Sequence, residues 1–440
     1  MSKNTDRNPR GTRDFFPEQM ATRLWIEDAW REASIRHGFQ EIEGPTFEHL
    51  DLYTLKSGDG IVSELFSFTR EGGKDTYALR PEFTPTLARM VAARGGSEPR
   101  PIKWFAIPSH FRAERPQRGR LREFRQWNVD MLGLDDPSAD AEVIATAVDC
   151  LCWLGLGPDS FRVRVSHRDA VAAALQSLGV AESKMTAAFE LLDRRDKLPN
   201  DVFAERAAGL GLTTEALAGF DALANTSAPI TTPLAEIADR AGIDPKVLAP
   251  MEAYGAALVE AGLDAFCDWD LGIVRGLAYY TGGVFEIRDA SGTERAIAGG
   301  GRYDGLVELF GGQPTSAVGF GMGDVVLGLL LEEKGLLAEA APPEPSVFLV
   351  STSEAWEGLL RSTMHGLRRM GLHAQRSYRA TRNLGKLLGE AGKRGASMVL
   401  IFDESCETGV VHIKDLESGE QTEVALADLE TYLFEHDELC

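Results

Sequence analysis

One stretch of this chain, from Ser109 to Gly133, constrains its fold more than any other. Its middle, Pro116-Gln-Arg-Gly-Arg120, has the proline and glycine of a turn, and its flanks carry aromatic and branched residues at strand-like spacing. The pattern predicts a strand, an arginine-bearing loop and a second strand. Because guanidinium groups bind phosphate and carboxylate in a bidentate manner, the stretch is a candidate polyphosphate or nucleotide site. A hairpin with solvated charged faces is equally compatible with it. The stretch holds six arginines, at positions 112, 115, 118, 120, 122 and 125.

The charge distribution limits the partners of the chain. Its 440 residues suggest two to three domains, and its formal net charge of −21 repels nucleic acid in general. A nucleic-acid partner must therefore meet a local basic patch. Residues 361–394 are the best candidate, because they contain nine Lys and Arg residues against one Glu. The same run also fits a solvated helical face.

Cysteine usage and hydropathy exclude several classes of protein. The five cysteines are odd in number and form no cluster of zinc-binding spacing with each other or with His. This usage favours a reducing cytosol, and no metal site made of protein residues is expected. The N-terminus is polar and lacks the apolar core of a signal peptide. Asp324 interrupts the best candidate for an 18-residue apolar run, so we expect no membrane span.

The first two thirds of the chain mix helical and strand patterns. Helices are expected at residues 17–37, 85–94 and 136–154, and strands at 39–45, 76–79, 161–166, 265–271 and 274–287. Residues 168–263 or thereabouts are rich in Ala and Leu at helical spacing, which predicts an inserted helical module. Residues 298–305 contain three consecutive glycines and predict a turn that leads into a helix.

Gly319, Gly321 and Gly323 invite comparison with a nucleotide-binding loop. Their spacing is G-x-G-x-G, however, and no βαβ pattern surrounds them. Close backbone packing within a strand explains them better. An apolar helix is then expected through Leu331, and residues 332–345 have the composition of a linker.

Residues 346–440 have a different pattern, in which strands and helices alternate. The first helix is expected to open at a capping box, Ser351-Thr-Ser-Glu354. The alternation predicts a small α/β domain with a largely parallel sheet. The basic run lies in this domain, which makes contact with nucleic acid its expected use. Strands are expected at 347–350, 372–377 and 397–402, helices at 351–370 and 383–394, and then a hairpin around 417–420 and a C-terminal helix.

Several of these stretches together resemble the class II aminoacyl-tRNA synthetases, and specifically the histidyl-tRNA synthetases. The resemblance covers nearly the whole chain. It rests on Arg10-Gly-Thr-Arg-Asp-Phe-Phe-Pro17, on Phe39 to Pro45 as class motif 1, on Phe111 to Phe124 as motif 2, on Arg275-Gly-Leu-Ala-Tyr-Tyr-Thr-Gly282 and on Gly300-Gly-Arg-Tyr-Asp-Gly-Leu306. The last two together with motif 2 are highly specific for the histidyl enzymes.

The resemblance implies an α+β fold and a ligase. It implies an antiparallel-sheet catalytic domain at 1–331 with the helical insertion at about 168–263, a linker at 332–345 and an α/β anticodon-binding domain at 346–440. The implied reaction is histidine–tRNA ligation: ATP, with Mg²⁺, activates L-histidine to histidyl-adenylate, and histidine passes to the 3′ end of tRNA(His). A cytoplasmic homodimer is implied as well, with Pro45 of motif 1 at its interface.

The resemblance also implies roles for single residues. Arg112 and Arg275 would be the catalytic cations at the α-phosphate and the histidine carboxylate. ATP would be bound by Arg112, by Glu114 at the adenine edge, by Arg120 at the terminal phosphates and by Phe124 stacked on adenine. Histidine would be bound by Glu82, Phe83, Thr84, Arg112, Gln126, Asp130, Arg275, Tyr279 and Tyr280, with Asp130 and one of the two tyrosines at the imidazole. The candidate tRNA-binding residues are Arg376, Arg379, Arg382 and Lys386.

These residue types suit the reaction. Attack of a carboxylate on a phosphate brings two anions together, and arginines from two separate strands neutralise both. Imidazole has one donor and one acceptor nitrogen, which a carboxylate and a phenol can address. A site whose polar groups would otherwise be left unpaired rejects other side chains strongly. No covalent enzyme intermediate is needed, in agreement with the absence of a persuasive Ser or Cys nucleophile.

Two positions depart from the family pattern. Ala278 stands where Asp is most common, and Val326 stands where class motif 3 ends in an arginine that clamps ATP. Arg302, Arg120 or Arg115 could compensate for the latter, or ATP binding is altered.

The missing arginine favours one alternative function. A catalytically silent paralogue would resemble the histidine-binding regulatory subunit of ATP phosphoribosyltransferase, which lacks an anticodon-binding domain. Arg112, Gln126, Arg275 and the basic C-terminal domain disfavour this alternative. Another class IIa synthetase is disfavoured by the segment from Arg275 to Gly282.

Overall fold

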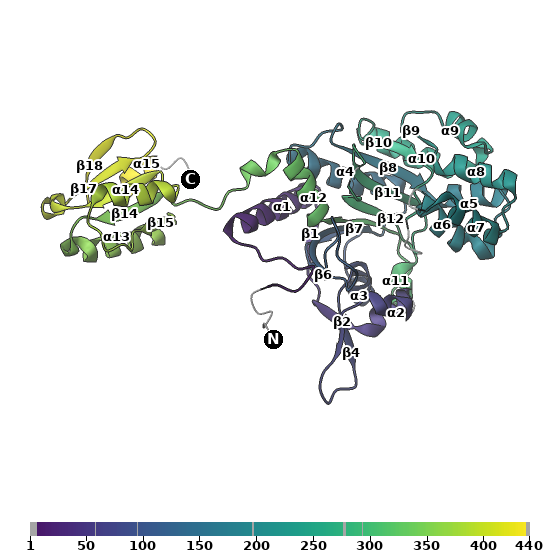
Figure 1. Cartoon of the computed structure of the whole chain (residues 1–440), viewed down its shortest axis with the longest axis horizontal. Helices are drawn as coiled ribbons and strands as arrows, with labels where there is room; N and C mark the ends of the chain where they lie inside the picture. The colour runs from purple at the N-terminus through teal and green to yellow at the C-terminus, as the bar shows by residue number, and fades with distance from the viewer. Residues whose placement is uncertain are drawn as a thin grey trace. The chain divides into compact units, whose positions relative to one another are not determined.

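The chain divides into two compact units, Met1–Ala340 and Ala341–Cys440 (Figure 1). The structure, a computed structural model, describes residues 7–57, 59–94, 96–195, 198–275, 279–292 and 294–436. The first unit is built on one large sheet, and the second on a smaller sheet of its own.

The large sheet is predominantly antiparallel, which confirms the predicted α+β class. Within the described residues its order is β1-β5-β7-β13-β12-β11-β8-β10-β9, with β6 paired to β7, and only the pairs β1–β5 and β10–β8 are parallel. Its strands are β1 Gln40–Glu41, β5 Ile102–Ala106, β6 Ser109–Phe111, β7 Glu123–Leu132, β8 Phe161–His167, β9 Ser227–Pro229, β10 Cys267–Asp270, β11 Gly283–Asp289, β12 Ala298–Arg302 and β13 Ala317–Gly323.

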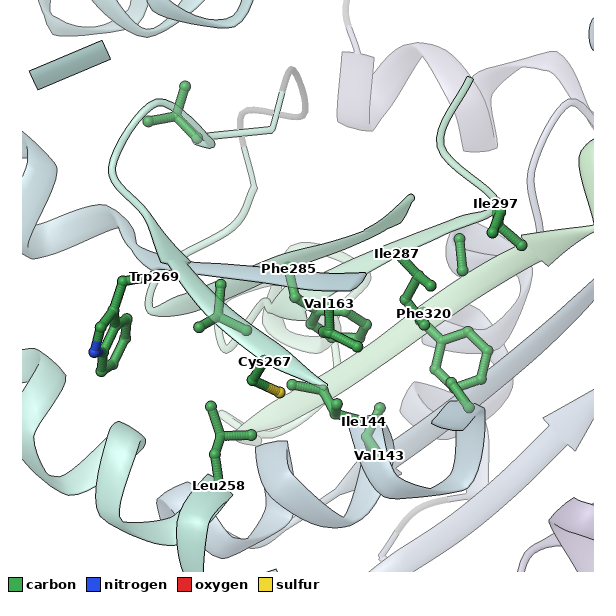
Figure 2. Close-up of a cluster of buried hydrophobic side chains, with 14 of the residues drawn as sticks. Val143, Ile144, Val163, Leu258, Cys267, Trp269, Phe285, Ile287, Ile297 and Phe320 are labelled. Atoms are coloured by element: carbon green, nitrogen blue, oxygen red, sulfur yellow. The ribbon is translucent and has the colours of Figure 1, made fainter. Parts of the chain in front are cut away.

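Helices cover one face of this sheet. Helix α4 (Pro137–Trp153) begins as predicted, because the Asp136 side chain accepts a hydrogen bond from the Ser138 N–H and Pro137 fills the first helical position. It packs against the sheet, against α1 (Pro17–Arg36) and against α10 (Pro250–Glu260). Figure 2 shows part of the core between them, where Val143, Ile144 and Leu258 meet Val163, Cys267, Trp269, Phe285, Ile287, Ile297 and Phe320.

The pleat of β7 separates the core from the opposite face of the sheet. Trp127, Val129 and Met131 point into the helix-covered core, since successive side chains of a strand alternate between faces. Trp127 stacks on Trp30 of α1 with ring centroids 6.1 Å apart. The intervening residues of β7 therefore face the side of the sheet that the core helices leave open.

A small sheet and several helices complete the first unit. The small sheet has the order β2-β4-β3, with β2 Phe47–His49, β3 Ser67–Thr69 and β4 Thr76–Leu79. Figure 1 shows helices α5 to α9 gathered at one end of this unit. The helices not yet named are α2 Leu50–Ser57, α3 Thr84–Arg94, α5 Arg168–Ser177, α6 Met185–Asp193, α7 Asn200–Leu210, α8 Thr214–Ala224, α9 Leu234–Ala241, α11 Leu306–Leu309 and α12 Asp324–Glu333, with short 3₁₀ helices η1 Asp59–Glu64, η2 Glu182–Lys184, η4 Pro245–Leu248 and η5 Leu336–Glu339.

The first unit differs from the sequence-based expectations in three places. Residues 298–302, expected within a turn, form strand β12, where a side chain on Gly300 would overlap the Gly319 carbonyl of β13. The helical module also contributes a strand, β9, to the sheet edge beside β10. The expected linker begins too early, because α12 continues to Glu333 and Leu336 of η5 packs against the core.

The second unit is an α/β sandwich. Its sheet has the order β15-β14-β16-β17-β18, in which β15, β14 and β16 are parallel and the remaining pairs antiparallel. The short 3₁₀ helix η6, which precedes the first α-helix, is capped by Ser353 and not by the expected Ser351, since the Ser353 hydroxyl accepts a hydrogen bond from the Ala355 N–H. The elements are β14 Val347–Ser351, η6 Glu354–Trp356, α13 Glu357–Arg369, β15 Ala374–Arg376, α14 Leu384–Lys393, β16 Met398–Phe402, η7 Glu404–Thr408, β17 Val410–Asp415, β18 Gln421–Ala425 and α15 Leu429–His436.

No helix in the described parts of the chain is long and apolar enough to cross a membrane.

Candidate functional site

A cavity of about 530 Å³ lies on the open face of the large sheet. Gln126, Asn128 and Asp130 of β7 line it, in alternation with the core residues of the same strand. Glu286 and Arg288 line it from β11. Strands β7 and β11 thus present polar side chains to one space, while apolar side chains of the same strands pack beneath the helices.

Glycines on the neighbouring strands make room for these polar groups. Gly319 pairs with Asp130 and Gly321 with Asn128 across the β7–β13 ladder. A Cβ on Gly319 would overlap the Asp130 Oδ1 atom, and one on Gly321 would lie 2.8 Å from the Gln126 amide carbon. The prediction of close packing within a strand is therefore confirmed for Gly319 and Gly321, whereas a Cβ on Gly323 would meet no atom within 4 Å.

One end of the cavity, which we call the buried end, is formed by Asp130, Tyr279, Tyr280 and Tyr303. The Tyr303 hydroxyl donates a hydrogen bond to Asp130 Oδ1, and the two residues are only 2% and 6% exposed. Burial raises the pKa of Asp130 to about 7, although the hydrogen bond from Tyr303 opposes the shift. The Tyr279 ring lies 4.8 Å from that of Tyr280 and 6.0 Å from that of Tyr303.

Sequence reasoning missed Tyr303. It placed Asp130 and one of Tyr279 and Tyr280 at the imidazole, whereas Tyr303 is the tyrosine that donates a hydrogen bond to the Asp130 carboxylate. The signal was present, because Tyr303 is part of the Gly300 to Leu306 motif that carried the resemblance. Ala278, the first departure from the family pattern, lies outside the described residues.

The segment that begins α3 closes one side of the cavity. Glu82 and Thr84 line it, and the Thr84 side chain is hydrogen-bonded to Tyr279. Phe83, expected with the histidine-binding residues, does not line the cavity. Its side chain is 1% exposed and packs in a hydrophobic cluster with Leu87. Successive side chains at the start of α3 point in different directions, so the Phe83 side chain points into the core while Glu82 and Thr84 line the cavity.

Arg112, the residue that follows β6, lines the cavity. Its Nε–H donates to the Pro81 carbonyl oxygen at 3.1 Å, and its guanidinium carbon lies 5.1 Å from the centre of the Phe124 ring. Burial lowers the pKa of Arg112, and the nearby Glu82 carboxylate opposes that shift. The His110 ring stacks on Phe124 with a centroid distance of 5.5 Å, which fixes the orientation of this aromatic side chain.

Arg275 enters from the other side in a strained conformation. With φ of +55° it is the one non-glycine residue among those described that has a positive φ. Its guanidinium forms an ion pair with Glu286, which also binds Arg288, and it lies over Gly299, where a Cβ would overlap it. Burial would lower the pKa of Arg275, but the Glu286 carboxylate outweighs this and the pKa is raised.

The other end of the cavity, which we call the open end, is formed by Gly119, Arg120, Arg295 and Val326. Gly119 has φ of +70° at the tip of the hairpin, which closes through backbone hydrogen bonds between Gln117 and Arg120. The predicted strand, loop and strand are thus confirmed. Arg120 lines the cavity and forms an ion pair with Glu114, which itself does not line it.

The six arginines of this stretch have different surroundings. Arg112 and Arg120 line the cavity, and Arg115 is exposed. Arg118 binds Glu294, and the Arg122 Nε–H donates to the Glu114 carbonyl oxygen at 3.1 Å. Only a part of the local arginine concentration therefore belongs to the candidate site.

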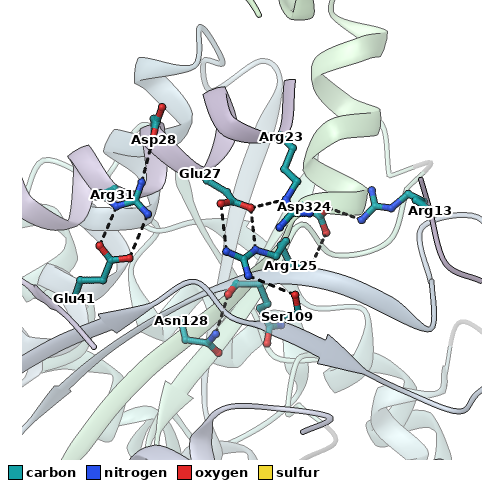
Figure 3. A network of polar contacts seen from close by, with 11 residues as sticks. Arg13, Arg23, Glu27, Asp28, Arg31, Glu41, Ser109, Arg125, Asn128 and Asp324 are labelled. Atoms are coloured by element: carbon teal, nitrogen blue, oxygen red, sulfur yellow. Dashed lines mark hydrogen bonds and ion pairs between the residues drawn. The ribbon is translucent and has the colours of Figure 1, made fainter. Parts of the chain in front are cut away.

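Arg125, the last of the six, holds the fold together. It binds Glu27 of α1, as Figure 3 shows. Its backbone N–H donates to Asp324 at 3.0 Å, and Asp324 in turn binds Arg13. This network fastens α1, β7 and the start of α12 to one another and so fixes the strand that carries Gln126 and Asp130.

Val326, the second departure from the family pattern, lines the open end and is 6% exposed. Arg302, one of its suggested replacements, is held elsewhere. Its guanidinium forms an ion pair with the buried Asp140 and donates to the Asp136 carbonyl oxygen at 3.0 Å. Arg302 is not among the residues that line the cavity.

The candidate tRNA-binding residues lie in the second unit, around β15 and α14. Arg376 and Arg382 both bind Glu357, at 2.8 and 2.7 Å, and Arg379 binds Glu390 at 3.2 Å. Glu357 precedes the basic run of residues 361–394. Its ion pairs with two arginines of that run therefore neutralise part of the positive charge that the run carries. Lys386 is exposed.

Within the described ranges, no group of three or more His, Cys, Asp and Glu side chains could hold a metal ion. Arginines line this cavity, and the buried Asp130 carboxyl group, whose pKa is raised, lies at its buried end. Such a cavity suits an anionic ligand that also carries a hydrogen-bonding ring.

Comparisons with known proteins agree with this chemistry. A family model described as histidyl-tRNA synthetase matches residues 11–323, and one described as an anticodon binding domain matches residues 346–436. The chain is 39% identical to a histidine–tRNA ligase of Natronomonas pharaonis and to one of Halobacterium salinarum, over 95% of each chain. In fold it is similar to the crystal structure of histidyl-tRNA synthetase from Nostoc sp. PCC 7120, with a TM-score of 0.78, 24% identity and coverage of 99% of this chain and 100% of that one.

Proposed function

Because this chain belongs to the histidyl-tRNA synthetase family, we propose as its function the ATP-dependent ligation of histidine to tRNA(His). One observation carries the proposal to the level of residues. The cavity collects arginines from two distant parts of the chain, Arg112 and Arg275, together with the buried carboxyl group of Asp130.

The two arginines act where charge accumulates. A carboxylate oxygen of histidine attacks the α-phosphorus of ATP, the bond to the pyrophosphate leaving group breaks, and histidyl-adenylate forms. Arg112 and Arg275 neutralise the two anions as they approach and stabilise the charge of the transition state. Glu286 holds the Arg275 guanidinium in place through their ion pair. A hydroxyl of the tRNA 3′ end then attacks the activated carbonyl carbon, and AMP leaves.

The buried end recognises the histidine side chain. An Asp130 carboxylate accepts a hydrogen bond from one imidazole nitrogen, while a tyrosine hydroxyl addresses the other. Tyr303, Tyr279 and Tyr280 all lie within reach of one another at this end. Glu82, Thr84 and Gln126 hold the α-amino group. Apolar side chains are excluded because they would leave these buried polar groups unpaired.

The remaining ATP contacts lie toward the open end. Phe124, oriented by His110, stacks on adenine, and the hairpin carries Glu114 at the adenine edge. Arg120 binds the terminal phosphates, and Mg²⁺ enters with ATP as part of the substrate. The charge of the triphosphate accounts for the two arginines of the hairpin that line the cavity, Arg112 and Arg120.

The two units divide the work. The first unit, with the insertion at about 168–263, forms the catalytic core, the residues between Ala340 and Ser346 connect, and residues 346–440 bind the anticodon. Arg376, Arg379, Arg382 and Lys386 contribute to that binding through the tRNA backbone. The protein works in the cytoplasm as a homodimer with motif 1 at its interface.

Isotopic exchange tests the proposal. The purified chain should exchange labelled pyrophosphate into ATP only when histidine is present, and it should then attach labelled histidine to tRNA(His). Each of the other amino acids serves as a control. Absence of exchange at saturating ATP and histidine would reject the ligase function and favour the silent histidine-binding paralogue.

A further inference from the structure

The open end contains a cation for which no motif of the family pattern accounts. Arg295 comes from the segment between β11 and β12 and lines the cavity. A Cβ built on Gly119 would lie 3.5 Å from Arg295 Cδ and 3.3 Å from Val326 Cγ2. The stem of the arginine, the valine and the tip of the hairpin therefore meet at one place. Val326 occupies the position at which the family pattern has an ATP-clamping arginine.

We propose that Arg295 replaces the arginine missing at position 326 and binds the β- and γ-phosphates of ATP together with Arg120. The replacement comes from a different element, because position 326 lies on α12 whereas Arg295 precedes β12. This inference rests on the proposed function for the identity of the nucleotide.

Arg295 differs from the neighbouring cations because no carboxylate of the described residues pairs with it. Among the described residues it makes no hydrogen bond or ion pair, whereas Arg275 and Arg288 are held by Glu286 and Arg120 by Glu114. Glu294, the neighbour of Arg295 in the sequence, is held by Arg118, with 2.6 Å between the Arg118 Nε and Glu294 Oε1 atoms. The nearest acidic side chain in the sequence is therefore engaged by another arginine.

The electrostatics of Arg295 and Arg120 favour the binding of a polyanion between the two side chains. Partial burial and repulsion by the Arg120 guanidinium lower the pKa of Arg295, and Glu114 opposes this. Two guanidinium groups that repel each other in the free protein are stabilised when a triphosphate enters the space they share. Binding then relieves a repulsion as well as forming charge-assisted hydrogen bonds.

The other suggested replacements do not meet these conditions. Arg302 is occupied by Asp140, and Arg115 is exposed on the hairpin without lining the cavity. Arg115 therefore supplies a matched control, since it is an arginine of the same hairpin outside the cavity.

Kinetics of pyrophosphate exchange with the full-length chain test the inference. Arg295→Ala should raise the KM for ATP about tenfold to a hundredfold, the range expected for loss of a charge-assisted contact. Competitive inhibition by AMP, which lacks the β- and γ-phosphates, should change less than about twofold, as should the KM for histidine. Arg115→Ala should match the wild type in all three, and Arg295→Lys should fall between the wild type and Arg295→Ala.

A double variant tests the replacement itself. Val326→Arg in the Arg295→Ala background returns a guanidinium to the position of the family pattern and should recover most of the lost ATP affinity. A double variant no better than Arg295→Ala would contradict the replacement. An unchanged KM for ATP in Arg295→Ala, or equal losses for ATP and AMP, would overturn the phosphate contact.

Failure of the proposed function gives a different result from failure of this inference. If the wild-type chain exchanges no pyrophosphate, the proposed function fails. Calorimetric titration of ATP and of AMP into wild type and Arg295→Ala then tests the phosphate contact, which predicts that the variant loses affinity for ATP but not for AMP. Thermal unfolding of each variant shows that it is folded. Should Arg295→Ala fail to fold, Arg295→Gln and Arg295→Lys carry the same comparison.

Discussion

The two ends of the cavity differ in the exposure and in the pairing of their polar side chains. At the buried end, Asp130 and Tyr303 are 6% and 2% exposed and bind each other, and Gly319 lies against the carboxylate with no room for a side chain. At the open end, Arg295 is exposed and has no partner among the described residues, and Arg120 is tied to a carboxylate of its own hairpin. One end is preformed, and the other is completed by its ligand.

Under the proposed function, the difference follows from the ligand that each end would recognise. An amino-acid side chain is discriminated by buried polar groups, because an ill-fitting ligand leaves them unpaired at a cost of about 1–3 kcal/mol each. A triphosphate is recognised mainly by its charge, which arginine side chains reaching in from loops can neutralise through charge-assisted hydrogen bonds. Substitutions should therefore have different effects on ligand binding at the two ends. Three predictions test this comparison.

Arg275→Ala should have the largest effect, because the proposed function places Arg275 at the reacting atoms. We expect the rate of adenylate formation to fall about a hundredfold to a thousandfold, as for other preorganised donors at a developing charge. Histidine binding should weaken much less. Single-turnover kinetics and calorimetry measure the two quantities, and Arg164→Ala, which removes an arginine bound to Asp270 on the neighbouring strands, is the control. Equal losses in rate and binding would contradict a role in the transition state.

Gly319→Ala should affect only the buried end. The added methyl group would overlap Asp130 Oδ1, so the KM for histidine should rise about tenfold or more while the KM for ATP stays near that of the wild type. Gly323→Ala on the same strand is the matched control, since a Cβ there meets no atom within 4 Å. If both variants behave alike, close packing on Asp130 is not what shapes the histidine site.

The smallest expected effect concerns pH and stability. The folded chain raises the pKa of Asp130 from 3.8 to about 7, so between these values the native state keeps a proton that the unfolded chain releases. The stability due to this proton is present at low pH and is lost as the pH rises through 7. Relative to Asp130→Asn, the wild type should lose about 1.4 kcal/mol of unfolding free energy between pH 6 and pH 8. Urea unfolding of both proteins measures this, and a difference that stays constant over that range would rule out the raised pKa.

Much of the framework could be predicted from local pattern. The helix of α1 ends at Arg36, followed by Gly38 with φ of +75°, and Asp136 with Pro137 begins α4. Both rest on the conformational preferences of a few adjacent residues. The strand, loop and strand of the arginine stretch were predictable for the same reason, as was the strand that contains Gly319 and Gly321.

Other features depend on partners that are distant in the sequence. The turn expected at Gly300 is a strand, because only β11 and β13 together supply the ladder into which a residue without a side chain fits. Phe83 looked like a neighbour of two ligand-binding residues, but the core beneath α3 takes its side chain. Tyr303 contacts a carboxylate 173 positions away, a distance over which no local pattern gives information.

The sequence by itself determined the kinds of element, the motifs and hence the family, because these depend on short-range preferences and on residue order. Only the tertiary structure decided which of many arginines remain free to bind a ligand. Arg125 and Arg118 are bound to Glu27 and Glu294, and Arg302 to Asp140, each across a long stretch of chain. Arg295 faces the space beside Val326 because two distant loops meet there. Charge at a site is a sum over neighbours in space, and the fold chooses those neighbours.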